Sequence, residues 1–266
     1  MMTVSAINAA DIISILKAEV ENFSWDPVEQ EIGTVIWIGD GIATIYGMDH
    51  AIYGEIVIFE NGIKGMVQDI RRNEIGCILF GKDTDIKEGS KVKRTKKRAG
   101  IPVGEAFIGR VINSLGDPID GKGPIESTNY RPIEFEAPGI TQRKSVTTPM
   151  ETGILTIDAM FPIGRGQREL IIGDRQTGKT SIAVDTILNQ KGKDVVCIYV
   201  AIGQKASSVA KLVSTLEHYG AMEYTTVLVS TASDPSSLQY IAPYAGTAVG
   251  EYFMYQGKDV LIVYDD

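Results

Sequence analysis

The stretch Gly173-Asp174-Arg175-Gln176-Thr177-Gly178-Lys179-Thr180 decides the fold of this chain. It satisfies the pattern G-x-x-x-x-G-K-[S/T], in which glycines let the backbone wrap around a phosphate so that successive N–H groups point inward. Lys179 can reach the β- and γ-phosphates of a nucleotide, and the hydroxyl of Thr180 can ligate Mg²⁺. The apolar run 169–172 is predicted to form a strand before the loop, and a helix is predicted over 180–190, which is the context that such a loop needs. The sequence therefore predicts a site for a purine nucleoside triphosphate, ATP with magnesium.

Outward from the loop, apolar segments alternate with helical ones to the end of the chain. Further strands are predicted over 194–200, 225–230 and 259–264, and further helices over 206–218 and 236–256. Strands rich in Val, Ile and Leu that are linked by helices indicate a parallel sheet covered on both faces. The last strand ends in Asp265, and a carboxylate at the carboxyl end of such a strand lies in the crevice where these sheets bind ligands. We expect Asp265 to hold Mg²⁺ through a water molecule, beside Thr180.

The N-terminal part has a different pattern. Short alternating segments separated by turn signals such as Gly39-Asp40-Gly41 predict a small closed β-barrel; they lie at 34–38, 42–46, 55–59, 65–70 and 77–80. Six bases follow between Lys91 and Arg98 without interleaved aromatics, which favours a solvated strand or linker face over a nucleic-acid patch. Glycine and proline punctuate residues 100–165. Gly116 to Pro124 must be mostly turns, in what we interpret as a segment connecting the barrel to the rest of the chain.

These patterns divide the chain into three parts. Residues 1–24 form an N-terminal element with an amphipathic helix at 8–23, whose apolar stripe packs either on its own domain or on a partner. Residues 25–95 form the barrel, and residues 96–266 form the nucleotide-binding domain. The expected fold class is α/β with an all-β N-terminal domain.

Bulk composition excludes several classes of function. The chain has 266 residues, 26 bases and 34 acids, so its net charge of −8 argues against nucleic acid as the main partner. Cys77 and Cys197 lie inside apolar runs and are interpreted as buried thiols in a reducing compartment. No apolar stretch reaches the roughly 18 residues that span a bilayer. The N-terminus resembles neither a secretion signal nor a transit peptide, so we expect a cytoplasmic protein unless a partner holds it at a membrane.

Four stretches together closely resemble the alpha-subunit family of the rotary, proton-translocating (F-type) ATP synthases, in order and over essentially the whole chain. They are Pro162 to Thr180, Gly109 to Asn113 with Gly116 to Pro124, Tyr199 to Ser207, and Tyr264-Asp265-Asp266. The resemblance implies a barrel crown, a RecA-like P-loop domain and a C-terminal helical bundle. It also implies a ring of three alpha and three beta subunits around a rotating gamma subunit, in which the N-terminal stripe docks the delta subunit.

The family continues beyond the position that matches Asp266, so the chain is interpreted as a fragment whose nucleotide domain is incomplete at its C-terminus. The resemblance further implies a peripheral protein on the cytoplasmic face of a bacterial plasma membrane. Its contact with the membrane would be made only through the complex.

Hydrolysis requires a group that orients and polarises the attacking water. The resemblance puts Gln204 where the catalytic beta subunit has a glutamate, and Gln176 where catalytic relatives have glycine. A neutral amide can hydrogen-bond water but cannot take its proton, so we expect a site that holds ATP or ADP without turnover. Some GTPases position water with a glutamine, which keeps turnover open as the alternative.

We assign the site residues accordingly. Those expected to contact the nucleotide are Gly173, Asp174, Arg175, Gln176, Thr177, Gly178, Lys179, Thr180, Ser181 and Gln204. Thr180 and Asp265 are expected to hold the metal, and no residue is assigned a catalytic role.

Two other classes of function remain as alternatives. One is a self-sufficient ring ATPase, such as an export motor or the catalytic beta subunit, which would need an acid where Gln204 stands. The other is an RNA-translocating hexameric helicase, which would need base-stacking aromatics on the barrel and a basic channel.

Overall fold

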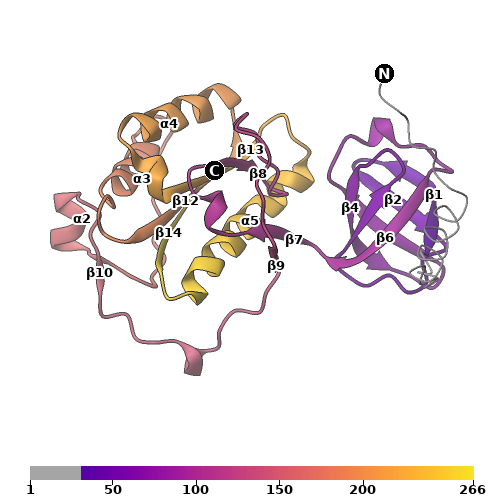
Figure 1. Cartoon of the computed structure of the whole chain (residues 1–266), viewed down its shortest axis with the longest axis horizontal. Coiled ribbons are helices and arrows are strands. Elements are labelled where there is room, and N and C mark those ends of the chain that lie inside the picture. The colour runs from indigo at the N-terminus through magenta and orange to yellow at the C-terminus, as the bar shows by residue number, and fades with distance from the viewer. Residues whose placement is uncertain (1–30) are drawn as a thin grey trace, which may run out of the picture. The chain divides into compact units, whose positions relative to one another are not determined.

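The computed structural model describes residues 31–266, so the helix predicted over 8–23 lies outside the described residues. The first part is a closed barrel in the order β1-β2-β5-β4-β3-β6, in which β6 also pairs antiparallel with β1 (Figure 1). Its strands are β1 (Ile32–Gly39), β2 (Ile42–Tyr46), β3 (Glu55–Phe59), β4 (Lys64–Ile70), β5 (Glu74–Leu79) and β6 (Lys91–Arg98). The predicted barrel is confirmed.

The turn between β1 and β2 shows why these residues form a hairpin. Asp40 and Gly41 both have positive φ values, 50° and 75°, and Gly39 pairs with Ile42 across the two-residue loop. Such turns match the twist of the flanking strands and favour Asp-Gly. Alternate side chains then point inward, and the barrel core is built from the buried residues Val35, Ala43, Ile45, Val57, Phe59, Val67, Ile75, Cys77, Leu79 and Val92.

The basic run is the barrel strand β6. Lys91, Lys93 and Lys97 are exposed on its outer side, whereas Arg94 turns inward and pairs with the fully buried Glu55 at 2.7 Å. The run therefore forms a solvated strand face plus one buried ion pair.

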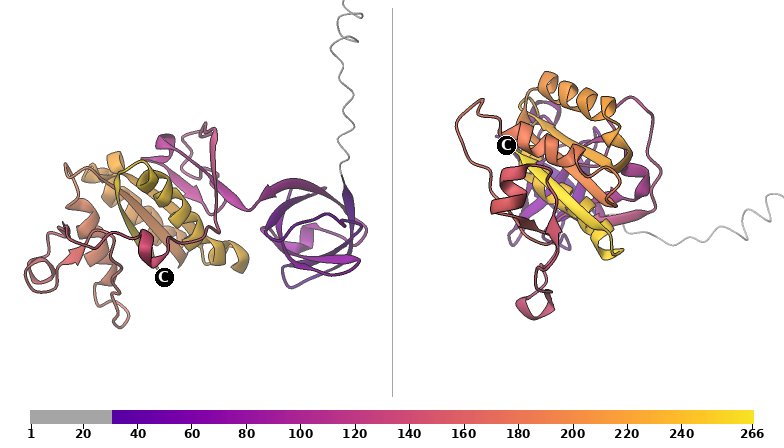
Figure 2. Two further views of the ribbon diagram at one scale, coloured as in Figure 1. Left: turned by 90° about the horizontal axis from the view of Figure 1, so that it is seen from below. Right: turned by 90° about the vertical axis from the view of Figure 1, so that its left-hand side faces the viewer.

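The second part is built on a four-stranded parallel sheet in the order β14-β12-β13-β8 (Figures 1 and 2). Its strands are β8 (Val111–Asn113), β12 (Val195–Gln204), β13 (Thr225–Thr231) and β14 (Asp259–Asp265), and its main helices are α3 (Lys179–Leu188), α4 (Ala206–His218) and α5 (Ser236–Tyr255). Smaller elements are the pairs β7 (Gly100–Val103) with β9 (Asn129–Pro132) and β10 (Pro149–Met150) with β11 (Ile163–Gly164), the helix α2 (Leu155–Met160), and short 3-10 turns at Asp83–Asp85, Glu105–Phe107, Ile140–Gln142 and Ala221–Tyr224.

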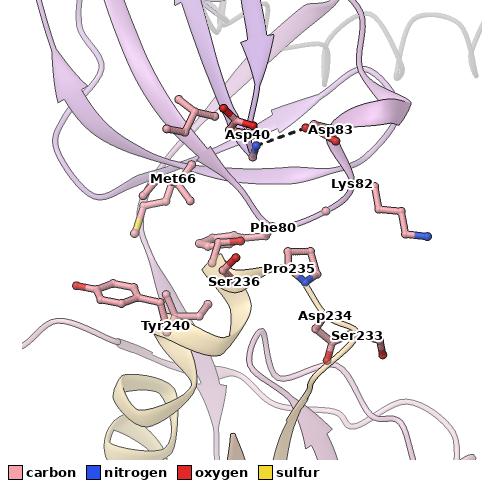
Figure 3. A pocket seen from close by; sticks show the side chains of 16 residues that line it. Asp40, Met66, Phe80, Lys82, Asp83, Ser233, Asp234, Pro235, Ser236 and Tyr240 are labelled. Atoms are coloured by element: carbon pink, nitrogen blue, oxygen red, sulfur yellow. Dashed lines mark hydrogen bonds between the residues drawn. The ribbon is translucent and has the colours of Figure 1, made fainter. Parts of the chain in front are cut away.

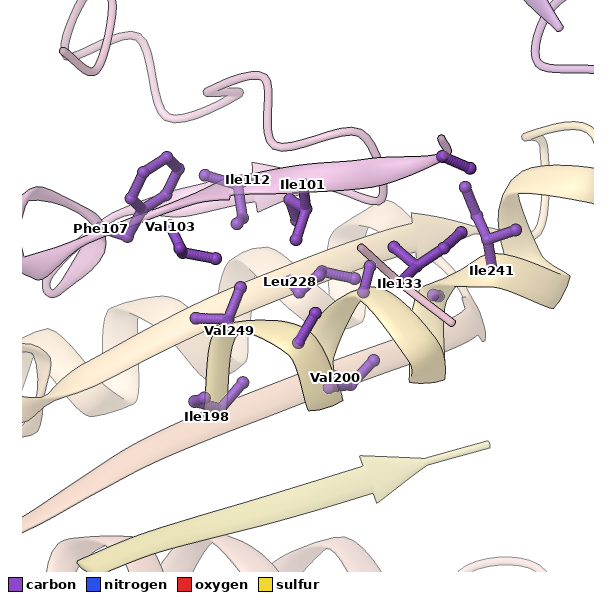
Figure 4. Close-up of a cluster of buried hydrophobic side chains, with 14 of the residues drawn as sticks. Ile101, Val103, Phe107, Ile112, Ile133, Ile198, Val200, Leu228, Ile241 and Val249 are labelled. Atoms are coloured by element: carbon purple, nitrogen blue, oxygen red, sulfur yellow. The ribbon is translucent and has the colours of Figure 1, made fainter. Parts of the chain in front are cut away.

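Strand β12 separates two apolar layers because successive side chains alternate between its faces. Val196, Ile198 and Val200 pack with α5, together with Leu228 of β13. Figure 4 shows Ile198, Val200 and Leu228 beside this helix. The odd-numbered residues of β12, among them Cys197 and Tyr199, pack with α3 and α4 instead. The predicted parallel sheet with both faces covered is therefore confirmed.

Helix α5 lies close to the sheet because it presents glycines there. A Cβ added at Gly246 would lie 2.4 Å from Cγ2 of Val200, and one added at Gly250 would lie 2.7 Å from Cδ1 of Ile262. Both distances are shorter than van der Waals contact allows, so larger residues would push the helix away from the sheet.

One sequence prediction is wrong here. Residues 169–172 form no strand, and Leu170 and Ile172 are 76% and 86% exposed. A strand exists only when a neighbour supplies its hydrogen bonds, and β14, at one edge of the sheet, pairs with β12 alone among the described strands. The sequence analysis also did not identify β8, which pairs with β13 through Val111 with Val227 and Ile112 with Leu228.

Among the described residues, no helix combines the length and the apolar character needed to cross a bilayer.

Candidate nucleotide and magnesium site

The glycine loop wraps around the ammonium group of Lys179. Helix α3 begins at Lys179, after Gly178, whose φ of 93° turns the chain into the helix. Nζ of Lys179 donates to the carbonyl oxygens of Gly173 and Asp174, both at 2.6 Å, and Oγ1 of Thr177 donates to the Asp174 carbonyl at 2.8 Å. The ammonium group and the positive end of the helix therefore lie at the same place, as anion binding requires.

The other loop residues surround this point. Arg175 and Gln176 are exposed on the loop, and Ser181 lies in the first turn of α3. Gln176 has a φ of 62°, a left-handed conformation that costs a side-chain-bearing residue about 1–2 kcal/mol. Glycine would occupy this loop position without strain. Glutamine there costs conformational energy but adds an amide side chain to the loop.

Thr180 and Asp265 meet although they are 85 positions apart: Oγ1 of Thr180 donates to Oδ2 of Asp265 at 2.9 Å. The contact follows from the fold, because β14 pairs in parallel with β12 up to Ala201 and Asp265, so its carboxyl end lies beside the start of α3. A hydroxyl and one carboxylate, completed by phosphate oxygens and water, is a ligand set that suits Mg²⁺. Within the described residues, no group of three or more His, Cys, Asp or Glu side chains is arranged to hold a metal ion.

Tyr199 is a site residue that the sequence analysis did not identify. It is fully buried on β12, and its hydroxyl donates to Oδ2 of Asp265, the oxygen that also accepts from Thr180. Burial, followed by the bond to Asp265 and its charge, raises the pKa of Tyr199 well above its usual value. The phenol is therefore a permanent donor at neutral pH. A tyrosine inside an apolar strand needs a partner for its hydroxyl, and this requirement was the available signal.

Gln204 reaches the same cluster because β12 is irregular at its end. Strict alternation would point Gln204 to the α5 face, but the register with β13 shifts between Ile202 and Gln204, and Gly203 has a φ of 65°. This bulge turns the side chain, so that Nε2 of Gln204 donates to the backbone oxygen of Asp265 at 3.2 Å. Bulges next to functional sites often redirect a side chain in this way. The groups gathered at Asp265 are thus two hydroxyls and an amide.

The bulge yields a prediction. Gly203→Ala is expected to destabilise the chain by about 1 kcal/mol, because alanine pays for the left-handed conformation, and to lower Tm by about 2–4 °C. Differential scanning calorimetry measures the change. Gly139→Ala is the matched control: its φ of −65° suits alanine and nothing lies within 4 Å, so Tm should stay level or rise slightly. Equal Tm values for the two variants would contradict the claim that the bulge requires a left-handed conformation at residue 203.

A cleft in the described part of the chain lies away from the glycine loop. About 620 Å³ in volume, it lies between barrel residues and the start of α5, with Phe80, Met66 and Tyr240 on its walls (Figure 3). Its charged side chains are the acids Asp40, Asp83 and Asp234 and the single base Lys82. An excess of acids disfavours a triphosphate, so the glycine loop is the better candidate despite its open geometry.

Comparison with known proteins follows the same division of the chain. The model of the ATP synthase alpha/beta family, beta-barrel domain, matches residues 28–96, and that of the nucleotide-binding domain of the same family matches residues 153–266. The ATP synthase subunit alpha of Caldanaerobacter subterraneus subsp. tengcongensis is 62% identical over 260 residues, 98% of this chain and 51% of the relative. The protein of the same name from Clostridium botulinum strain Hall is 58% identical over 260 residues, 98% and 52% of the two chains. The chain spans about half the length of these curated relatives.

Proposed function

This chain belongs to the ATP synthase alpha/beta family, and from that premise we propose that it binds Mg-ATP or Mg-ADP without turning it over, as an alpha subunit of a rotary, proton-translocating ATP synthase. Its nucleotide would be held by residues 173–181 and Gln204, and its magnesium by Thr180 and Asp265. When bound, the ion supplies positive charge against the β- and γ-phosphates. Lys179 supplies the second cation, and the start of α3 orients the phosphates.

The observation that carries this proposal is the chemistry around Asp265. A catalytic site needs a group that accepts a proton from water or polarises it strongly. The amide of Gln204 is neutral, and its Nε2 donates to the Asp265 backbone oxygen. Oδ2 of Asp265 already accepts from Thr180 and Tyr199. These groups hold a magnesium nucleotide but do not activate water.

The assembly is part of the same proposal. We infer a ring of three alpha and three beta subunits around gamma, with delta as a further partner, in which gamma rotation driven by a proton gradient supports ATP synthesis at beta. The protein would lie peripherally at the cytoplasmic face of the plasma membrane and contact the membrane only through the complex. The relatives that match 98% of this chain carry the name ATP synthase subunit alpha, which favours this assembly over an export motor or a helicase.

The turnover experiment tests the proposal directly. The full chain, assembled with beta subunits whose own sites are disabled, is expected to retain ATP and release no phosphate over many minutes in a single-turnover assay. Gln204→Glu is expected to leave turnover slow, since one carboxylate does not supply the other groups that stabilise the transition state. Fast hydrolysis by the wild-type chain would overturn the non-catalytic assignment, and fast hydrolysis by the variant would show that Gln204 alone prevents it.

The nucleic-acid alternative has an inexpensive test. A helicase should bind single-stranded RNA with an affinity that falls steeply as salt rises. The net charge of −8 leads us to expect no such binding at physiological salt.

A further inference from the structure

We propose that Tyr199 is a positioning residue for the magnesium ion: its hydroxyl fixes the Asp265 carboxylate so that Oδ1 faces the ion and its water shell. The inference rests on the proposed function, because it concerns the metal that accompanies the nucleotide. It concerns a residue outside the glycine loop, on a strand that contacts Asp265 from the core side.

The phenol can position the carboxylate because it is itself held firmly. Tyr199 is 0% exposed and belongs to the apolar layer that also contains Ile187 of α3 and Val209 of α4. An aromatic ring in a close-packed core keeps its rotamer, so its hydroxyl has one position. Residue 199 lies opposite Val263 in the ladder, two residues before Asp265 on the neighbouring strand, which brings the hydroxyl to the carboxylate.

Both donors use the same carboxylate oxygen. Oδ2 of Asp265 accepts from Oγ1 of Thr180 at 2.9 Å and from the hydroxyl of Tyr199, and Oδ1 accepts no hydrogen bond from the described residues. A carboxylate oxygen offers about two lone-pair sites, so these two donors fill Oδ2. Asp265 can therefore serve the metal through Oδ1 alone.

The geometry has a consequence for metal affinity. Groups that orient a metal-binding carboxylate typically change metal affinity by about 10–100-fold when they are removed. The Thr180 hydroxyl must also serve the ion, so Tyr199 is the donor whose only role at the carboxylate is to orient it. Without the phenol, the Asp265 side chain can rotate and lose its fixed direction.

The experiment compares Tyr199→Phe with wild type in the full chain. ATP affinity is measured by isothermal titration calorimetry in EDTA and again in excess Mg²⁺, and the ratio of the two affinities gives the gain due to the metal. We expect the EDTA affinity to stay within about twofold and the gain to fall about 10-fold. Mn²⁺ in place of Mg²⁺ gives a second readout, because a changed coordination alters the electron paramagnetic resonance spectrum of the nucleotide complex.

Tyr224→Phe is the matched control. The Tyr224 hydroxyl also contacts α3, but at its C-terminal end, where it donates to the carbonyl oxygens of Ile187 and Leu188 at 3.1 and 3.2 Å. The same atom is removed and its part-buried hydrogen bonding is lost, so stability can fall while the gain due to the metal should not change.

The outcomes separate this inference from the proposed function. If the gain in ATP affinity due to Mg²⁺ were unchanged in Tyr199→Phe, the positioning role would be overturned. An equal fall of the ATP affinities in EDTA and in Mg²⁺ would also overturn it, because it would show a merely structural role. A wild-type chain that binds ATP no better with Mg²⁺ than with EDTA would instead overturn the proposed function, and the inference with it.

Discussion

Replacing Lys179 with alanine is expected to abolish tight binding of Mg-ATP, with a loss of affinity of about 100-fold or more. A hydrogen bond to a charged group contributes about 1.5–3 kcal/mol, and each 1.4 kcal/mol is a factor of ten in affinity. Nζ of Lys179 lies 2.6 Å from the carbonyl oxygens of Gly173 and Asp174, so the ammonium is already inside the loop that would surround the phosphates. Removing it deletes both the charge and up to three donors.

Isothermal titration calorimetry of the full chain measures the loss. Lys211→Ala serves as the control, because that exposed lysine on α4 has the same charge and lies outside the loop. We expect the barrel to stay folded in both variants, since Lys179 is not a member of the barrel core, and circular dichroism checks this. An ATP affinity that stays at the wild-type value in Lys179→Ala would remove the loop assignment altogether.

Breaking the buried ion pair of the barrel is expected to have the largest effect on stability. Glu55 is fully buried, and its carboxylate accepts from Nε and Nη2 of Arg94 at 3.0 and 2.7 Å. The backbone amides of Ile52 and Lys96 complete its hydrogen bonds at 3.2 and 2.8 Å. Glu55→Gln keeps the shape but removes the negative charge from a buried ion pair, and removing one partner of such a pair costs about 3–5 kcal/mol.

Urea denaturation, monitored through the fluorescence of the barrel, measures this loss in the free energy of unfolding. Glu74→Gln is the matched control, because Glu74 pairs with Arg71 at 2.8 Å at the exposed surface and should contribute less than about 1 kcal/mol. The double variant Glu55→Gln/Arg94→Met removes both charges and should recover much of the loss. If Glu55→Gln cost no more than the surface variant, the pair would not be a stabilising element.

The same pair predicts the response to acid. Burial by itself raises the pKa of Glu55, but the hydrogen bond from Arg94 and those from the Ile52 and Lys96 amides outweigh it, so the folded-state pKa lies below the ordinary value. A lowered pKa adds stability that is complete above the unfolded value of about 4.3 and is lost as pH falls through the folded value. Wild type should therefore lose stability below about pH 4.3, and this part of the slope should be missing in Glu55→Gln.

Alternation of residue types made most of the second part predictable from sequence. Helix α4 has the predicted bounds, and β12, β13, α5 and β14 differ from their predicted ranges by a few residues at most. Their apolar runs are bounded by Gly, Asp or Ser, so both the type and the ends of each element are encoded locally. The meeting of Thr180 with Asp265 followed from the rule that ligands bind at the carboxyl ends of parallel strands.

What could not be predicted depends on partners distant in the sequence. The run 169–172 has strand-like residues, yet no described strand pairs with it. Strand β8 has only three residues among glycines and prolines, and it forms because the edge of β13 is available. Local composition carries no information on whether a pairing strand is available.

In the cluster around Asp265, too, some features could be predicted from the sequence and others could not. The family resemblance implied Gln204, but nothing in the sequence indicated the bulge at Gly203 that directs its side chain. Tyr199 reads as one more core residue until its hydroxyl is placed against the carboxylate. The glycine-loop pattern predicts the proposed donors to the nucleotide, whereas the orientation of the acid required the three-dimensional pairing of β12 with β14.

The closure of the barrel by β1 and β6 determines how this part of the chain can meet other proteins. Because every described barrel strand has a neighbour on both sides, these six strands leave no row of backbone amides to capture a foreign strand. Recognition must then rely on side chains such as Ile36 and Trp37, which are 46% and 47% exposed. The binding properties of such a surface can change through single substitutions. The closed barrel also prevents crowded copies of the chain from exchanging strands.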